Sequence, residues 1–401
     1  MIRPEVWRWL TEGAAWGVAL AWCVRTKDAL DNLPGIVDLT ALDRDVEPEG
    51  SPTLTVIVPA RDEAEHIGAT LDALMQQDYA GVHVVAVDDR SSDATGTIME
   101  EYAVRYPQRL TVVHVMELSP GWLGKTHAMA HGLAVSASDY VLFTDADVLF
   151  SPSVLRRSLA YAVREHADHL VTLPTLIVKG WGEGVVLGFF QTFGMWLVRP
   201  WKASDPKAKH DVIGIGAFNM LRREALAELG GMLPQRLTVL EDITLARRVK
   251  AAGMRQRVAF APGLVLVHWA SGAMGLMRVM SKNLFSAFNF RPVLALLGCL
   301  GIGLFCVGPL AGLAWWRTLA PGLLVVACIS VTYRIYGETS RIPPKYGWGF
   351  PLGALALIYA LLRSMVVVWK DGGVRWRGTL YPLRELRRHN SPWKWQKMGK
   401  S

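Results

Sequence analysis

Two aspartates end an apolar run and could hold a metal ion. The run Tyr140 to Thr144 is typical of a buried β-strand, and Asp145 and Asp147 follow it with one residue between them. In open α/β sheets, ligands bind outside the carboxyl ends of the strands, where paired acids can hold a divalent cation against a phosphate. Taken alone, the pattern is equally typical of an Asp-rich turn. Other residues must therefore decide between a metal site and a turn.

Polar loops also follow the two strands predicted at Leu54 to Pro59 and Val82 to Val87. The first loop lacks the glycines that a dinucleotide fingerprint or a Walker phosphate loop requires. A helix cap explains one acid after the second strand, but carboxylates at strand ends can also accept hydrogen bonds from a nucleotide base or ribose. The two loops contain Pro59, Arg61, Glu63, Asp88 and Asp89.

A lysine and a second acid pair add to this set. Gly121 and Gly124 allow close approach of the backbone, and Lys125 precedes a helix whose N-terminus favours a phosphate group. Glu241 and Asp242 begin another predicted helix, where acids can also simply complement the helix dipole. Three strand ends and two helix starts thus carry charged groups that could serve one reaction.

Short β-branched runs and amphipathic helices alternate between residues 54 and 267, which predicts a doubly wound, Rossmann-like and mostly parallel sheet. Further strands are expected at Leu110 to Val115, Leu170 to Pro174 and Leu264 to Val267, and helices at Glu65 to Gln77, Ser92 to Arg105, Thr126 to Ala137 and Pro152 to Glu165.

The rest of the chain indicates a membrane. Of the 401 residues, 51% are hydrophobic, and two or three spans are predicted within residues 293–369. Val293 to Trp316 is long enough to cross, Thr318 to Tyr333 looks short, and Phe350 to Trp369 contains Arg363. Residues 1–30 are expected to anchor the chain or lie in the interface. Residues 275–290 are expected to form an amphipathic helix in the membrane interface, and a buried core helix is the alternative.

The chain has a net charge of +8, and residues 370–401 form a basic tail with nine Lys and Arg against Asp371 and Glu385. Beside membrane segments, such a cluster favours anionic lipid over nucleic acid. Three full spans would place this tail opposite a cytosolic catalytic domain, contrary to the positive-inside tendency. All four cysteines lie in apolar segments, so neither a disulfide framework nor a cysteine metal site is expected.

The order of these motifs resembles the family 2 glycosyltransferases of the GT-A fold, and Pro59 to Ala64 is closest to the hopanoid-associated and carotenoid-type membrane enzymes. The resemblance runs from about Leu54 to Phe290 and implies a GT-A catalytic domain over residues 50–270. It implies that Mg²⁺ or Mn²⁺ binds at Asp145 and Asp147, with His268 as a further candidate ligand, and that Asp242, beside Glu241, is the general base. Pro59, Arg61, Glu63, Asp88, Asp89, Lys125 and Asp145 would bind the nucleotide sugar, while Gly214, Gly216 and Phe218 would line the acceptor side.

We therefore predict an inverting, metal-dependent transferase in the inner membrane, with a cytosolic GT-A domain that moves one sugar from a UDP- or GDP-sugar to a lipid. The sequence lacks the Q-x-x-R-W pattern of many processive synthases, which favours transfer of a single sugar. The stretch Val374 to Gly378 also resembles the lipid-modifying subgroup and could contact substrate. The alternatives are a sugar-phosphate nucleotidyltransferase and a non-catalytic lipid-binding protein.

Overall fold

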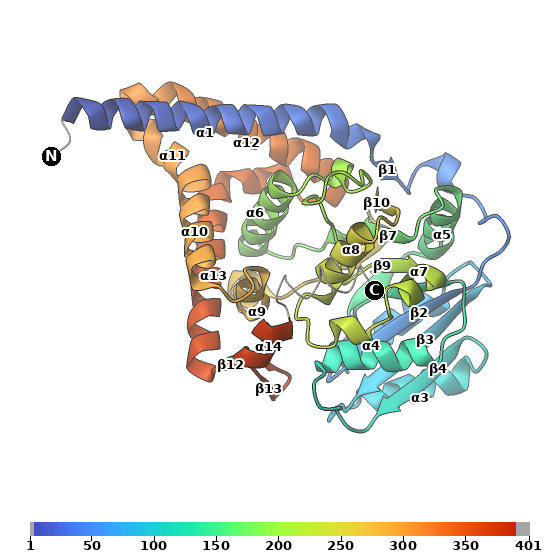
Figure 1. Cartoon of the computed structure of the whole chain (residues 1–401). Coiled ribbons are helices and arrows are strands. Elements are labelled where there is room, and N and C mark those ends of the chain that lie inside the picture. Colours follow the sequence, from blue (N-terminus) through green and yellow to red (C-terminus); the bar gives the residue numbers. More distant parts are fainter. Residues whose placement is uncertain (1–3, 390–401) are drawn as a thin grey trace. The chain divides into compact units, whose positions relative to one another are not determined.

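The structure is a computed structural model that describes residues 4–389 (Figure 1). It divides into two compact units. The α/β unit contains residues 36–177, 200–268 and 371–389, and the helical unit contains residues 4–35, 178–199 and 269–370. Each unit is described by itself below.

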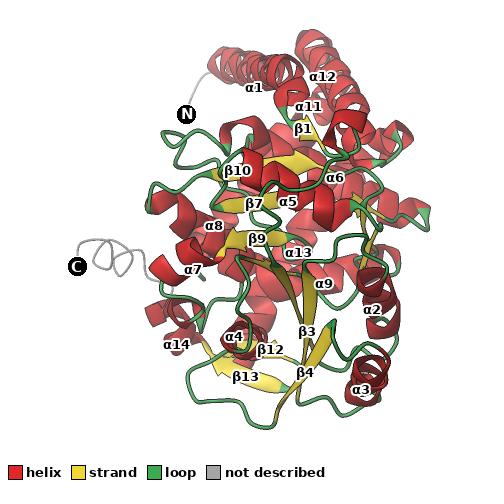
Figure 2. Ribbon diagram, turned by 90° about the vertical axis from the view of Figure 1, so that its right-hand side faces the viewer, coloured by secondary structure: helices red, strands yellow, loops and turns green. Residues whose placement is uncertain are grey.

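An eight-stranded sheet forms the centre of the α/β unit, in the order β1-β10-β7-β9-β5-β2-β3-β4. Its neighbours pair in parallel except for β9, which runs antiparallel to both β5 and β7. Strands β10, β7 and β9 lie side by side in Figure 2. The strands are β1 (Val37–Asp38), β2 (Leu54–Ala60), β3 (Val82–Asp89), β4 (Leu110–Val115), β5 (Tyr140–Phe143), β7 (His169–Leu173), β9 (Asn219–Arg222) and β10 (Gln256–Phe260).

The predicted mostly parallel α/β sheet is confirmed. A smaller sheet orders β6 (Val148–Phe150), β11 (Val265–Val267) and β8 (Thr175–Leu176). The pattern of alternating strands and helices missed β9 and β10, because both are short and mix polar with apolar residues. The helices of this unit are α2 (Ile67–Met75), α3 (Thr95–Arg105), α4 (Gly124–Ala134), α5 (Val154–Arg164), α7 (Arg223–Glu228), α8 (Glu241–Ala251) and α14 (Leu383–His389).

Helices α4 and α8 are fixed by one hydrophobic core. Ile57, Val87 and Phe143 contribute to it from the sheet, and Met129 and Leu245 contribute from the two helices. Because α4 begins at Gly124 and α8 at Glu241, this packing sets the positions of the charged residues at both helix starts.

Part of the predicted basic tail folds back onto the α/β unit. Strands β12 (Gly373–Trp376) and β13 (Thr379–Pro382) form an antiparallel hairpin, and α14 follows it. The tyrosine of β13 supplies a contact to the start of α4, since the Gly124 N–H donates a hydrogen bond to the Tyr381 hydroxyl at 3.1 Å. Residues 390–401 of the predicted tail lie outside the described residues.

The helical unit contains three helical stretches that are long and apolar enough to cross a membrane: Pro292–Ala314, Trp316–Ser340 and Pro344–Asp371. The second is 25 residues long, so the expectation of a short segment at Thr318 to Tyr333 was wrong: the helix continues through its polar C-terminal residues. The helices of this unit are α1 (Pro4–Asn32), α6 (Trp181–Leu197), α9 (Gly272–Ala287), α10 (Pro292–Ile302), α11 (Gly308–Ala311), α12 (Trp316–Ser340) and α13 (Phe350–Asp371).

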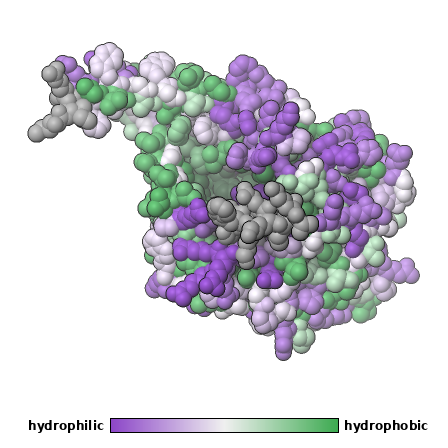
Figure 3. Space-filling model, viewed as in Figure 1, coloured by the Kyte–Doolittle hydropathy of each residue, from purple (hydrophilic) through white to green (hydrophobic). Residues whose placement is uncertain are grey.

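Helix α1 lies alongside α12 (Figure 1), and Arg317 forms an ion pair of 2.8 Å with Glu12. This pair gives the Glu12 carboxylate, which lies within the apolar N-terminal segment, a partner of opposite charge. Hydrophobic residues cover α10 on the face shown in Figure 3, and Val293, Leu297 and Leu300 are each more than half exposed. Such a contiguous apolar surface is typical of a helix that faces lipid or another protein.

We expect that a side chain at Gly132 will separate α4 from the sheet. A Cβ at this position would lie 2.6 Å from the Ile57 side chain and 3.0 Å from that of Val87. Overpacking of this kind costs about 1–3 kcal/mol. Gly132→Leu should therefore lower the Tm by several degrees in a circular-dichroism melt in detergent. The matched variant Ala134→Leu, at an exposed position of α4, should leave the Tm unchanged, and equal melting of the two variants would contradict this packing.

Candidate active site

The acidic loops meet at one edge of the sheet. In the register, Ile57 of β2 is opposite Phe143 of β5, and Ala60 of β2 is opposite Asp88 of β3. The loops after these three neighbouring strands therefore begin close together, as parallel strands require. The sequence expectation that these strand ends share one crevice is consistent with this register.

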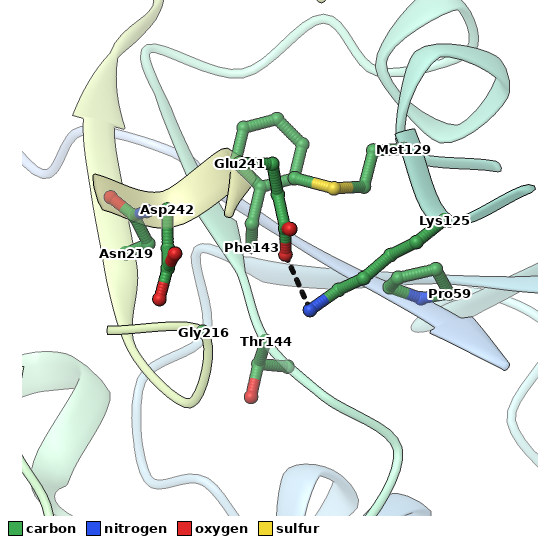
Figure 4. A pocket seen from close by; sticks show the side chains of 9 residues that line it. All are labelled: Pro59, Lys125, Met129, Phe143, Thr144, Gly216, Asn219, Glu241 and Asp242. Atoms are coloured by element: carbon green, nitrogen blue, oxygen red, sulfur yellow. Dashed lines mark ion pairs between the residues drawn. The ribbon is translucent and has the colours of Figure 1, made fainter. Parts of the chain in front are cut away.

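Lys125 lies between the two acid pairs. Its Nζ is 2.5 Å from Asp145 Oδ1 and 2.6 Å from Glu241 Oε1. Figure 4 shows the Lys125 side chain extended from α4 toward Glu241. Burial opposes the charge on Lys125, but the two carboxylates outweigh it and raise the lysine pKa well above its ordinary value. Residues from the loop after β5, the start of α4 and the start of α8 thus form one charge cluster.

Asp242 follows Glu241 in the first turn of α8. Its Oδ1 accepts a hydrogen bond of 2.7 Å from the Ile243 N–H. Burial, together with the neighbouring Glu241 charge, raises the pKa of Asp242 to about 7. A carboxyl group with this pKa can accept a proton near neutral pH and release it again.

The predicted acceptor loop passes between the two acid pairs. A Cβ at Gly214 would overlap the Asp242 carbonyl, and a Cβ at Gly216 would lie 2.8 Å from Asp145 Oδ2. Gly214 therefore allows a close backbone approach that a Cβ would block, whereas a Cβ at Gly216 would meet only the side-chain ends of Asp145 and Lys125. Phe218 is fully buried, and its ring lies 6.4 Å from that of Phe150. A direct contact between Phe218 and an acceptor would require this side chain to leave the core.

Asp147 lies in a partly buried, negatively charged environment that favours a nearby cation. Burial, followed by the charges of Asp145 and Glu63, raises its pKa to about 6. Within residues 4–389, no three His, Cys, Asp or Glu side chains are grouped as a metal centre. The two aspartates still fit Mg²⁺ or Mn²⁺, because Mg²⁺ is usually held by one or two carboxylates together with substrate phosphates.

The predicted further ligand, His268, is placed near Asp147 by strand register. Val267, the last residue of β11, is antiparallel to Val148, the first residue of β6. His268 and Asp147 are therefore the next residues along these two paired strands. Its role as a metal ligand stays a prediction.

The residues predicted to bind a nucleotide already have protein partners. His114 bridges Asp88 and Glu100, with Nδ1 3.0 Å from Asp88 Oδ2 and Nε2 2.7 Å from Glu100 Oε1. The hydrogen bond to Glu100, followed by that to Asp88, raises the histidine pKa above its usual value despite partial burial. Asp89 accepts two hydrogen bonds from the Arg90 guanidinium, at 2.8 and 2.9 Å. These contacts fix the loop after β3.

The loop after β2 is held in a similar way. Ser92 donates its backbone N–H to Asp62 Oδ1 at 2.7 Å, and the Asp62 N–H donates to Ser91 Oγ at 3.1 Å. Glu63 forms an ion pair with Arg377, the residue at the turn of the C-terminal hairpin. Arg61 lies 3.9 Å from the Asp62 carboxylate.

Sequence reasoning missed several residues around the acids. A small pocket is lined by residues of the sheet, of the loop after β5 and of the starts of α4 and α8. Asn219 is buried there, and its Oδ1 lies 2.5 Å from His169 Nε2. Burial lowers the pKa of His169 to about 4, so this histidine is neutral. The pocket residues are Pro59, Lys125, Met129, Phe143, Thr144, Gly216, Asn219, Glu241 and Asp242 (Figure 4).

Comparison with known families identifies the domain. The family described as "Glycosyltransferase like family 2" matches residues 52–283, which is more than half of the chain. The protein belongs to glycosyltransferase family 2. The expected resemblance to the carotenoid-type members of this family is also confirmed. A 4,4'-diaponeurosporenoate glycosyltransferase from Staphylococcus aureus (strain USA300) is 37% identical over 134 residues, and that from the bovine strain RF122 / ET3-1 is 36% identical over 135 residues.

These matches cover 33% of the chain and 34% of each relative, so they span about a third of the length of the curated relatives. Among solved structures, a mannosyltransferase from Pyrobaculum calidifontis, in complex with GDP-Man and Mn²⁺, has a TM-score of 0.55. It is 20% identical, and the match covers 88% of this chain and 99% of that one. The likeness confirms the GT-A type of fold for this family 2 glycosyltransferase.

We expect the site to destabilise the fold as the pH rises. Asp242 has a pKa of about 7 in the folded protein and near 3.8 when unfolded. The folded state therefore binds this proton more tightly, and the resulting stabilisation is lost as pH rises from about 4 through 7. Asp242→Asn removes the titration, so its Tm relative to the wild type should increase between pH 5 and pH 8. This difference is measured by melts at several pH values.

Asp43→Asn is the matched control, because that side chain is 69% exposed. Its Tm difference from the wild type should not change with pH. A Tm difference for Asp242→Asn that stays constant from pH 5 to pH 8 would contradict the raised pKa.

Proposed function

We propose that this family 2 enzyme transfers a single sugar, with inversion, from a nucleotide-sugar donor to a hydroxyl group of a membrane lipid. The observation that carries the proposal is the cluster in which Lys125 joins Asp145 to Glu241 beside Asp242. This cluster combines a carboxylate that can act as the base for the acceptor with charged groups that can bind a diphosphate. A nucleotidyltransferase would need a glycine-rich triphosphate loop after β2, and Arg61 to Ala64 contains no glycine.

In the proposed reaction, the Asp242 carboxylate accepts the proton of the acceptor hydroxyl. The acceptor oxygen forms a bond to the anomeric carbon, while the bond from that carbon to the diphosphate oxygen breaks and its electron pair leaves with the nucleoside diphosphate. Attack from the face opposite the leaving group inverts the anomeric configuration. The pKa of about 7 suits Asp242 to this role at neutral pH.

Asp145 and Asp147 would hold a divalent cation, proposed as Mg²⁺ or Mn²⁺. When bound, this ion neutralises charge that develops on the leaving diphosphate. The raised pKa of Asp147 supports the assignment, because a cation there would relieve the repulsion from Asp145 and Glu63. Lys125 can exchange its carboxylate partners for diphosphate oxygens, since it lies at the start of α4, where helix N–H groups also favour an anion.

The lipid acceptor is supported by the apolar surface of α10 and by the relatives. Their name specifies a carotenoid acid as the substrate of those enzymes. The mannosyltransferase with a similar fold was solved with a GDP-sugar, which supports a UDP- or GDP-sugar as the donor class. A carboxylate acceptor would need no base, because it is already ionised at neutral pH. The basicity of Asp242 therefore favours a hydroxyl acceptor in this protein.

We expect Asp242→Asn to lower sugar transfer by at least about 100-fold, because general base catalysis contributes about 10²–10⁴. Wild-type activity should rise with pH up to about 7, as Asp242 loses its proton. The measurement is incorporation of radiolabelled sugar from a panel of UDP- and GDP-sugars into membrane lipid. Addition of EDTA should abolish incorporation, and Mn²⁺ or Mg²⁺ should restore it.

Asp43→Asn, at an exposed position, should transfer sugar at the wild-type rate. Equal incorporation by the wild type and Asp242→Asn would exclude Asp242 as the base and would favour a carboxylate acceptor. If no donor in the panel releases its nucleoside diphosphate, the proposed function itself is excluded.

We further propose that two of the three candidate spans cross the membrane. The second stretch of the α/β unit ends at His268, and its third stretch begins directly after Lys370. There, Tyr381 contacts Gly124, and His389 Nε2 lies 3.0 Å from the Pro234 carbonyl oxygen. Residues that touch one another in water lie on one side of the membrane, so an even number of crossings must separate them. The basic C-terminal segment then shares the cytosolic side proposed for the catalytic domain, in agreement with the positive-inside tendency.

We expect a protease to cleave a C-terminal tag and a tag in the exposed loop at residues 49–51 from the same side of sealed vesicles. Inverted vesicles, which expose the cytosolic face, should lose both tags, and right-side-out vesicles should keep both. Immunoblotting of each tag is the measurement. Opposite protection of the two tags would establish an odd number of crossings and contradict the fold of residues 371–389.

A further inference from the structure

The C-terminal hairpin has an arginine where the backbone disfavours one. Trp376 pairs with Thr379, which leaves Arg377 and Gly378 as a two-residue turn. Both have a positive φ, of 44° and 81°, as in a type I′ turn. Such turns strongly prefer Asn-Gly or Gly-Gly, because a Cβ is strained in this region. Turn formation alone therefore does not explain Arg377.

The turn contacts the loop after β2, which belongs to the proposed donor site. The Arg377 guanidinium forms an ion pair with Glu63 and donates a hydrogen bond to the Asp62 carbonyl oxygen at 3.3 Å. Tyr381, on the second strand of the hairpin, is 6% exposed and accepts the Gly124 N–H. The hairpin is thus attached both to the loop after β2 and to the residue that precedes Lys125.

The partner of Arg377 belongs to the acidic cluster. Burial raises the pKa of Glu63, Arg377 opposes that rise, and the charge of Asp145 adds to it. Glu63 in turn contributes to the raised pKa of Asp147. Arg377 is therefore a second cation beside the acidic residues of the site. The first is Lys125, which pairs with two of these acids from the start of α4. Its side chain is 38% exposed, so a ligand from solvent can reach it.

We propose that Arg377 binds the diphosphate of the nucleotide donor, so that a segment beyond the membrane helices completes the donor site. This inference rests on the proposed function. A planar guanidinium can donate two parallel hydrogen bonds to phosphate oxygens, which an ammonium cannot do. In the structure the Arg377 guanidinium is paired with Glu63. A bound diphosphate accepts some of the hydrogen bonds that the guanidinium otherwise donates to Glu63. Tyr381 holds the hairpin in place through Gly124.

The test compares nucleotide binding with stability in the full-length protein in detergent. Isothermal titration with UDP and GDP in the presence of Mn²⁺ gives the Kd of the wild type, Arg377→Asn and Arg377→Lys. We expect Arg377→Asn to weaken nucleoside diphosphate binding about tenfold or more, while uridine and guanosine bind as before. Its Tm should stay equal or rise, because asparagine fits the turn. Arg377→Lys should recover only part of the affinity.

The matched control is Arg384→Asn on α14, the helix that follows the hairpin, where the side chain is exposed. This variant should bind both diphosphates as the wild type does. Wild-type affinity in Arg377→Asn would overturn the proposal. Equal weakening of nucleoside and nucleoside diphosphate, or a fall in Tm that accompanies weaker binding, would also overturn it, because Arg377 would then only position the loop. Absence of binding by the wild type would instead refute the proposed function.

Discussion

Lys125 links the two acid pairs of the candidate site, and their arrangement at this edge of the sheet depends on it. Four acids approach one another there: Glu241, Asp242, Asp145 and Asp147. Without a cation between them, their mutual repulsion in a partly buried site would favour protonation or separation. Lys125 contacts one acid of each pair, at 2.5 and 2.6 Å. The core that packs α4 against β2 and β5 therefore also determines how closely the two acid pairs can lie.

The same charges affect the four acids in two different ways. Asp145 and Glu241 are both paired with Lys125, whereas Asp242 and Asp147 have raised pKa values of about 7 and about 6. Burial is the largest cause in both cases, and the nearest like charge is the second. In the proposed reaction, one of these two acids accepts a proton and the other needs a cation. In that proposal a cation would relieve the repulsion between Asp147 and Asp145, and Asp242 would receive the proton of the acceptor.

The C-terminal hairpin follows the last candidate span in the chain and contacts the loops of this site. Residues 371–389 belong to the α/β unit although three candidate spans precede them. The return of the chain constrains the membrane topology and also brings Arg377 to Glu63 and Tyr381 to Gly124. Loss of the hairpin would therefore affect the loop after β2 and the start of α4, which are far from it in sequence.

The sequence by itself determined the parts that depend on local patterns. Alternating β-branched runs and amphipathic helices predicted the parallel sheet. The strand-end motifs at Asp88 and Asp145 and the helix start at Glu241 predicted which segments carry polar groups. The apolar stretches predicted the three candidate spans, although the pattern made α12 too short because its last turns are polar. These features follow from neighbours in the chain, which periodicity and residue type report directly.

Only the tertiary structure decided which of these groups meet. Residue spacing did not indicate that Lys125 would join Asp145 to Glu241, that Asn219 and His169 would form a buried pair, or that Arg377 would reach Glu63 from more than 300 residues away. Burial also set the pKa of Asp242, because desolvation depends on everything packed around the carboxyl group and not on its neighbours in sequence. Long-range contacts and shared burial arise from the packing of the whole domain, so one-dimensional patterns do not contain them.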